Sequence, residues 1–130
     1  MKKMLIVEDD DLTQKVLSKI FRSDFQIDIC ESAEEFYQSY SSNRYDIIIM
    51  DISLRGSKHG LELTKEIKAS VDHGSTPILC LTAHALLKDK KNAIESGIDA
   101  FITKPVSNNI LKETVASLLK QRSVRKDIDQ

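Results

Sequence analysis

Acidic side chains follow two apolar runs of this sequence. Glu8 and Asp9 come directly after the run 4–7, and Asp51 closes the run 47–50. Continuous apolar runs are typical of strands buried in a parallel sheet, and the carboxyl ends of such strands meet at one ligand-binding edge. Carboxylates gathered there repel one another unless a cation or a proton intervenes. Because Mg²⁺ prefers carboxylate oxygens, the pattern predicts a divalent metal site at this edge.

A hydroxyl and an amine end two later apolar runs. Thr82 follows the run 78–81, and Lys104 follows the run 100–103. An ionised aspartate such as Asp51 is an oxygen nucleophile that needs no general base, and a cation and a hydroxyl can stabilise a transferring phosphoryl group. Taken singly, each residue is more often an ordinary turn, cap or surface residue. Their convergence on one edge favours a phosphorylation site.

Strand-like and helix-like segments alternate along the chain with short connections. Apolar runs predict strands at residues 4–7, 25–30, 47–50, 78–81 and 100–103. Helical spacing of apolar residues predicts helices at about 12–22, 33–40, 61–71, 88–96 and from about 108 onward. This alternation indicates an α/β fold, a doubly wound five-stranded parallel sheet covered on both faces. The strand order 2-1-3-4-5 is one common solution, which periodicity alone does not select.

Capping residues mark several of the predicted helix ends. They are Asp11 with Gln14 and Ser32 with Glu35 as capping boxes, Gly97 as a C-cap, and Ser107 as the cap of the last helix. The predicted inner face of that last helix consists of Ile110, Leu111, Val115, Leu118 and Leu119. Asp10 and Asp11 are interpreted as a solvated acidic helix start, without a role in a site.

Length and composition limit the classes that the chain can belong to. Its 130 residues, 41% hydrophobic and 30% charged, suit one domain at about residues 1–122 with a polar tail at 123–130. The net charge of −1 gives no overall attraction to nucleic acid or to an anionic membrane. Neither a signal peptide nor a membrane-spanning run is apparent, so a cytoplasmic location is expected. Cys30 and Cys80 lie at or within apolar runs and are expected to be buried free thiols.

With these residues at four strand ends, the sequence from about Lys3 to Leu119 resembles the receiver domains of two-component response regulators, particularly single-domain chemotaxis-type regulators. The resemblance implies the flavodoxin-like receiver fold with strand order 2-1-3-4-5. It implies that Asp51 is the phosphoacceptor and that Mg²⁺ is bound by Asp9, by Asp51, by the backbone carbonyl of Ser53, and by Glu8 through water.

Further roles are implied only by this resemblance. Thr82 and Lys104 would contact the phosphoryl group, and the Lys104–Pro105 peptide bond would be cis. Thr82 and Phe101 would form the conformational switch, although an aromatic residue in a strand is as often simply packed. Ser53 and His84 would tune the lifetime of the phosphoryl group.

The loop after Asp51 departs from the family pattern. Receivers commonly carry a proline a few residues after the phosphoacceptor and a glycine eight after it, whereas here the proline is absent and Gly60 stands nine residues on. We interpret this as a one-residue insertion in which Gly56 relaxes the turn. Phe101 also replaces the more frequent tyrosine.

The expected function is that of a signalling domain, a self-phosphorylating and self-dephosphorylating protein and not a turnover enzyme. It would take a phosphoryl group from a histidine kinase or a histidine-containing phosphotransfer protein, docked near the 12–22 helix. It would then signal to an unidentified downstream protein through the 88–96 helix, the 100–103 strand and the last helix. A monomer is expected, with dimerisation on phosphorylation left open.

Other interpretations of the sequence remain open at this point. The chain could be a receiver excised from a hybrid histidine kinase, or a phosphorelay intermediate. An aspartate-nucleophile phosphohydrolase is a remote alternative, because Asp51-Ile52-Ser53 lacks the second acid of an Asp-x-Asp motif. A nucleotide- or flavin-binding module is disfavoured, because the four glycines form no glycine-rich loop.

Overall fold

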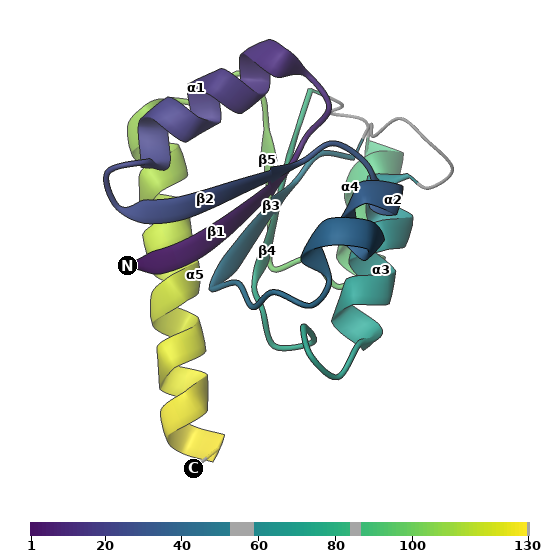
Figure 1. Cartoon of the computed structure of the whole chain (residues 1–130), viewed down its shortest axis with the longest axis vertical. Helices are drawn as coiled ribbons and strands as arrows, with labels where there is room; N and C mark the ends of the chain where they lie inside the picture. The colour runs from purple at the N-terminus through teal and green to yellow at the C-terminus, as the bar shows by residue number, and fades with distance from the viewer. Residues whose placement is uncertain (53–58, 84–86, 130) are drawn as a thin grey trace.

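A five-stranded parallel sheet forms the centre of the molecule, in the order β2-β1-β3-β4-β5 (Figure 1). The computed structural model describes residues 1–52, 59–83 and 87–129. The strands are β1 (Lys2–Val7), β2 (Phe25–Cys30), β3 (Ile47–Met50), β4 (Ile78–Thr82) and β5 (Ala100–Thr103). The helices are α1 (Asp11–Phe21), α2 (Ala33–Glu35), the π-helix η1 (Phe36–Tyr40), α3 (Gly60–Ala69), α4 (Leu87–Glu95) and α5 (Asn108–Asp129). The predicted fold class and strand order are confirmed.

The register of the central strands brings the two acidic segments together. Val7 at the end of β1 lies opposite Met50 at the end of β3. The next residues, Glu8 and Asp51, therefore leave the sheet side by side, and the Asp51 amide still donates to the Val7 carbonyl at 3.0 Å. Val7 and Met50 are both buried and apolar, so the ends of β1 and β3 are held together by packing as well as by main-chain hydrogen bonds.

Helices cover both faces of the sheet, as Figure 1 shows. On one face lie α1 and α5, whose buried residues include Leu17, Phe21, Leu111 and Val115. On the other face lie α2, η1, α3 and α4, and the buried residues there include Phe36, Leu63 and Ile67. The prediction that Ile110 belongs to the inner face of α5 is wrong. Its side chain is 54% exposed, because the buried stripe of α5 begins one residue later, at Leu111.

The helix caps match the sequence prediction at most ends. Ser32 and Ser107 accept hydrogen bonds from the amides of Glu35 and Ile110, and Gly97 has a positive φ of 97°. The capping box predicted for Asp11 and Gln14 is wrong. The N-cap of α1 is Asp10, whose carboxylate accepts hydrogen bonds from both the amide and the hydroxyl of Thr13.

The second predicted helix, through Tyr40, divides into α2 and the π-helix η1. The π-turn is seen in the hydrogen bond from the Ser41 amide to the Phe36 carbonyl at 2.8 Å. Tertiary contacts hold this geometry. The Tyr37 hydroxyl donates to Glu66 on α3, and the His73 Nε2 atom contacts the Ser41 carbonyl at 2.7 Å.

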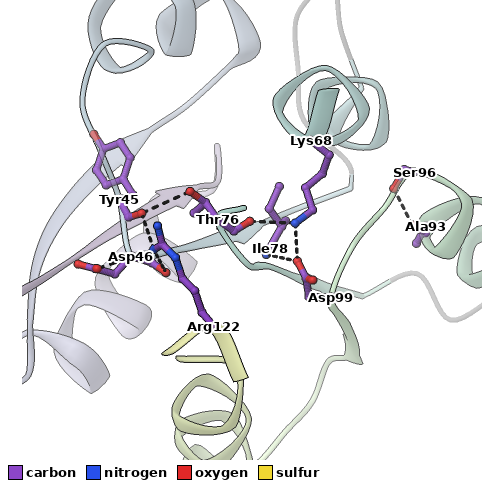
Figure 2. A network of polar contacts seen from close by, with 9 residues as sticks. All are labelled: Tyr45, Asp46, Lys68, Thr76, Ile78, Ala93, Ser96, Asp99 and Arg122. Atoms are coloured by element: carbon purple, nitrogen blue, oxygen red, sulfur yellow. Dashed lines mark hydrogen bonds and ion pairs between the residues drawn. The ribbon is translucent and has the colours of Figure 1, made fainter. Parts of the chain in front are cut away.

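At the edge of the sheet where the strands begin, a polar network ties helices to strands (Figure 2). Arg122 of α5 donates to the carbonyl oxygens of Tyr45 and Asp46, each at 3.1 Å. Lys68 of α3 donates to the Thr76 carbonyl at 3.0 Å and to the Asp99 carboxylate at 2.8 Å. Helices from both faces are thus fastened to this edge, which we call the amino edge.

Beyond Arg122, helix α5 continues to Asp129 and extends past the sheet in Figure 1. Residues 123–130 were expected to form a polar tail, and the boundary at residue 122 stays a prediction. Cys30 and Cys80 are buried free thiols, as expected. Among the described residues, none of the helices has the length and apolar character needed to span a membrane.

Candidate phosphorylation site

Three carboxylates meet at the opposite edge of the sheet, where the strands end, which we call the carboxyl edge. Glu8 and Asp9 follow β1, and Asp51 follows β3. One oxygen from each of the three lies within 4.8 Å of the others. Glu8 is only 3% exposed and Asp51 9% exposed, so water screens their charges poorly. The sequence placed these three residues at one edge, and the structure brings them into one cluster.

The Glu8 carboxylate connects several parts of the site. Its Oε2 atom accepts hydrogen bonds from the amides of Asp9 at 3.0 Å and Asp10 at 3.3 Å. Its Oε1 atom lies 3.2 Å from the Lys104 ammonium. The side chain of Glu8 therefore closes the turn that carries Asp9, and it links that turn to the segment after β5.

Burial and the neighbouring Asp51 carboxyl, through a hydrogen bond and its charge, raise the pKa of Glu8 to about 7. The Lys104 ammonium opposes this shift of the Glu8 pKa, because it favours the ionised carboxylate. The ionised form of Glu8 is thus disfavoured by its burial and by its acidic neighbour. A divalent cation would stabilise that form.

The donor set suits a hard cation. The three clustered side chains, Glu8, Asp9 and Asp51, all offer carboxylate oxygens, the ligand type of Mg²⁺ sites. Asp9 is the most exposed of the three, so it lies on the side open to solvent, from which a hydrated ion arrives. Burial first, and then the neighbouring Asp51, raise the pKa of Glu8, and a bound cation would favour its ionised form.

Lys104 and Thr82 come to the site from adjacent strand ends. The Lys104 amide donates to the Thr82 carbonyl at 2.7 Å, which extends the pairing of β4 and β5 by one residue. The Lys104–Pro105 peptide bond is cis, as the resemblance implied. The Lys104 ammonium contacts Glu8 in this structure, and Thr82 is fully buried at the end of β4.

Phe101 lies on the same face of the sheet as Thr82. Phe101 is opposite Cys80 and Thr103 is opposite Thr82 in the β4–β5 ladder, so the alternation of side chains sends all four toward one face. That face carries α3 and α4, because Ile78, two residues before Cys80, packs with Leu63 of α3. The Phe101 side chain is only half-buried there.

Gly60 brings helix α3 against the main chain that follows Asp51. A Cβ atom at residue 60 would lie 2.0 Å from the Asp51 carbonyl oxygen, a distance that no side chain can occupy. The Gly60 amide also donates to the Ile52 carbonyl at 3.1 Å. Ser53, Gly56 and His84 lie outside the described residues, so the proposed roles of Ser53 and His84 and the interpretation of an inserted residue stay predictions.

Gln14 has a structural part in this site that its position in the sequence did not predict. A capping box was expected there, whereas the Gln14 Nε2 atom donates to the Glu8 carbonyl oxygen at 2.6 Å. The signal in the sequence was a polar residue on the inward side of α1, three positions before the buried Leu17. That position faces the core and the end of β1.

An apolar groove adjoins the acidic cluster. It has a volume of about 270 Å³ and lies between α1 and the segment after β5. Its lining includes Leu12 and Val16 of α1 together with Lys104, Pro105 and Val106. Leu12 is 70% exposed and Val16 48% exposed, so the α1 side of the groove presents apolar surface to solvent.

Comparison with known proteins gives a consistent result. The sequence model of the family described as "Response regulator receiver domain" matches residues 4–116. The chain is 34% identical over 122 residues to hybrid signal transduction histidine kinase I of Dictyostelium discoideum, and the match covers 87% of the chain and 7% of that protein. It is 31% identical over 119 residues to the chemotaxis protein CheY of Halobacterium salinarum, a match that covers 91% of the chain and 97% of that protein.

A solved structure gives the same picture. The receiver domain of the sensor histidine kinase PA1611 from Pseudomonas aeruginosa superimposes with a TM-score of 0.83 at 28% identity, over 92% of this chain and 98% of that one. That structure has a magnesium ion coordinated in its active-site cleft. The relatives thus include a protein of about the same length as this chain and another of which the chain spans only a small part.

Proposed function

Because this chain belongs to the response regulator receiver domain family, we propose that it accepts a phosphoryl group from a phosphohistidine onto Asp51 and signals through altered protein contacts. The observation that supports this most strongly is the clustering of Glu8, Asp9 and Asp51 beside Lys104 at the carboxyl edge. Family membership makes the chain part of a two-component signalling system. The phosphoryl transfer, the metal and the individual residue roles are our proposal.

In the proposed reaction, a carboxylate oxygen of Asp51 attacks the phosphorus atom of the donor phosphohistidine. The new O–P bond forms as the P–N bond breaks, and the electron pair of that bond leaves with the imidazole nitrogen, which takes up a proton. No general base is required, because an ionised carboxylate is already a nucleophile. The product is an aspartyl phosphate.

Charge on the transferring oxygens must be stabilised as the bond changes. Glu8, Asp9 and Asp51 would hold Mg²⁺, which when bound would neutralise both the carboxylates and the phosphoryl oxygens. Lys104, now paired with Glu8 at 3.2 Å, would turn its ammonium toward the phosphoryl group. The Thr82 hydroxyl at the end of β4 would donate a hydrogen bond to the same group.

The proposed output is a shift between two conformations. Drawing Thr82 toward a phosphoryl group would leave room on the α3–α4 face of the sheet, where the half-buried Phe101 side chain also lies. Rotation of Phe101 into that room would change the surface formed by α4, β5 and α5. The downstream partner would recognise that change.

The proposed docking site of the phosphodonor is the apolar groove beside α1. A donor protein must bring its phosphohistidine to Asp51, and the groove is lined by Lys104, which also contacts the acidic cluster. Exposed Leu12 and Val16 supply the apolar surface that an amphipathic helix of a histidine kinase or phosphotransfer protein would cover. A cytoplasmic location is part of this proposal.

The direct test is phosphorylation by acetyl phosphate with Mg²⁺, followed by mass spectrometry of the intact protein. Wild type should gain one phosphoryl group, and Asp51→Asn should gain none. The matched control is Asp46→Asn, which changes an aspartate at the amino edge and should leave phosphorylation unchanged. An unmodified wild type, or equal modification of Asp51→Asn, would refute the proposal.

The metal requirement has a separate test. Asp9→Ala should phosphorylate at least tenfold more slowly than wild type at limiting Mg²⁺, because ligand loss weakens binding of the ion. Equal rates would show that Asp9 is not a ligand. The same samples can be assayed for hydrolysis of a small phosphate ester, and steady turnover would favour the phosphohydrolase alternative.

A further inference from the structure

The carbonyl of Glu8 is the first main-chain acceptor beyond the end of strand β1. Before it, the Val7 carbonyl accepts from the Asp51 amide, and the Glu8 amide donates to the Cys30 carbonyl of β2 at 2.9 Å. The chain then turns away from the sheet. The Glu8 carbonyl accepts a hydrogen bond from the Gln14 side chain at 2.6 Å, across six residues of sequence.

This contact is buried, and the polar groups at both ends need it. Glu8 is 3% exposed and Gln14 9% exposed, so solvent has little access to the carbonyl or the amide. A buried carbonyl without a partner is unfavourable, and a buried side-chain amide is equally so. Gln14 lies in the first turns of α1, where its main-chain N–H donates to the Asp10 carbonyl at 3.0 Å.

The peptide plane explains how this contact reaches the metal-binding acids. The Glu8 carbonyl and the Asp9 N–H belong to one planar peptide unit, so fixing the first fixes the direction of the second. The Asp9 N–H is the group that donates to the Glu8 Oε2 atom at 3.0 Å. The hydrogen bond from Gln14 therefore holds the Glu8–Asp9 peptide unit and, through the Asp9 N–H, supports the position of the Glu8 carboxylate.

We propose that Gln14 is a positioning residue that preorganises the Glu8–Asp9 turn for Mg²⁺, an inference that rests on the proposed function. Without the Gln14 amide, the Glu8 carbonyl loses its buried donor and the Glu8–Asp9 peptide unit is held less firmly, so more of the ordering of this turn is left to the binding of the ion. Some groups hydrogen-bond to the ligands of a metal ion without touching the ion itself. Removing such a group commonly lowers the metal affinity by about tenfold or more. Gln14 touches neither the ion nor the phosphoryl group.

The test is a Mg²⁺ titration of ¹⁵N-labelled protein followed by NMR. Gln14→Met keeps the length of the side chain and removes its amide, and it should bind Mg²⁺ about tenfold more weakly than wild type. The control Gln38→Met makes the same change at an exposed position of η1 and should bind as wild type does. All affinities are compared at a temperature where each metal-free protein is fully folded.

A spectroscopic signature separates positioning from general stabilisation. In metal-free Gln14→Met, the Asp9 amide proton should exchange faster and move upfield, because its hydrogen bond to Glu8 Oε2 loosens. A merely structural role would lower the melting temperature and leave the Mg²⁺ affinity and the Asp9 amide unchanged. That result, with normal binding by wild type, would overturn the inference and leave the proposed function standing.

Wild type alone provides a second measurement, should Gln14→Met fail to fold. The Gln14 side-chain amide protons should exchange slowly, and they should shift at the same Mg²⁺ concentration as the Asp9 amide. Exchange as fast as that of the exposed Gln38 side chain would overturn the inference. Absence of any Mg²⁺ binding by wild type would refute the proposed function, and the metal role of Gln14 with it.

Discussion

At the scale of single residues, Glu8 controls the electrostatics of the acidic cluster. Its carboxylate accepts hydrogen bonds from the amides of Asp9 and Asp10 and pairs with Lys104. Burial, and then the neighbouring Asp51, raise the pKa of Glu8. The folded protein therefore favours a proton on Glu8 at a pH where a carboxyl group in an unfolded chain has none. Stability must therefore depend on pH through this residue, and so must the proposed binding of Mg²⁺.

The pH dependence of stability follows from the direction of the shift. The pKa of Glu8 rises from 4.5 to about 7 on folding. Its contribution to the free energy of unfolding is therefore greatest below pH 4.5 and is lost as pH rises toward 7. In metal-free buffer, wild type should lose more stability between pH 5 and pH 8 than Glu8→Gln, by up to about 3 kcal/mol, as measured by urea unfolding.

Glu62→Gln is the control for this experiment, because Glu62 is exposed on α3 and its removal should keep the wild-type pH dependence. At pH 8, Mg²⁺ should reduce the difference in the loss of unfolding free energy between wild type and Glu8→Gln, since the cation favours the ionised carboxylate. Parallel pH profiles for wild type and Glu8→Gln would contradict the assignment of the raised pKa.

At the scale of elements, strands were the most predictable part of the sequence. Runs such as 47–50 are apolar throughout, because both faces of a central strand are buried, and no helix of that length would be stable alone. The ends of these runs then located Asp51, Thr82 and Lys104. These candidate site residues could be predicted because their positions follow from the backbone alone.

Elements that depend on tertiary contacts could not be predicted in the same way. The π-turn of η1 depends on Tyr37 reaching Glu66 and on His73 reaching Ser41, partners far away in the sequence. The contact between Gln14 and Glu8 likewise depends on how α1 is placed against β1. A local pattern contains no information about such distances.

The choice of N-cap for α1 was also beyond local pattern, because Asp10 and Asp11 are adjacent and both suit the position. The structure makes a testable distinction between them. Asp10→Ala should lower the free energy of unfolding by about 1 kcal/mol, since it removes hydrogen bonds to the Thr13 amide and hydroxyl. Asp11→Ala should lower the free energy of unfolding by less, because it loses only a favourable charge near the helix N-terminus.

Urea unfolding of the two variants in metal-free buffer measures this difference. Thr13→Val removes the hydrogen bond from the Thr13 hydroxyl and keeps the one from the Thr13 amide. Its loss of unfolding free energy should therefore be smaller than that of Asp10→Ala. A larger loss in Asp11→Ala than in Asp10→Ala would show that the helix begins one residue later than in the structure.

At the scale of the whole molecule, the two edges of the sheet have separate tasks. The carboxyl edge gathers the acidic cluster with Lys104, and the amino edge carries the network of Arg122, Lys68 and Asp99 shown in Figure 2. Helix α5 begins near the first edge and is fastened at the second. The acidic cluster at one edge and the anchoring network at the other are therefore connected by α5.

This separation predicts that stability can be changed without changing the site. Arg122→Met keeps the aliphatic stem and removes two hydrogen bonds to main-chain carbonyls and an ion pair with Asp46 at 3.8 Å. It should lower the free energy of unfolding by about 1 to 3 kcal/mol and leave Mg²⁺ affinity unchanged below the melting transition. Urea unfolding and a Mg²⁺ titration measure the two quantities.

Lys120→Met is the matched control, because it removes a nearby exposed cation of α5 and should alter neither quantity by much. A weaker Mg²⁺ affinity in folded Arg122→Met would contradict the separation. It would mean that the position of α5 at the amino edge is transmitted through the sheet to the acidic cluster.

The network at the amino edge also affects which substitutions the molecule tolerates. Arg122 and Lys68 bind carbonyl oxygens of Tyr45, Asp46 and Thr76, and every amino acid has such an oxygen. Replacing Thr76 by another residue therefore keeps the acceptor, whereas replacing Arg122 or Lys68 removes the donor. Asp99 is different, because its side-chain carboxylate accepts from both Lys68 and the Ile78 amide. In a library of random variants, the side chains of Arg122, Lys68 and Asp99 should therefore be retained more often than those of Tyr45 and Thr76.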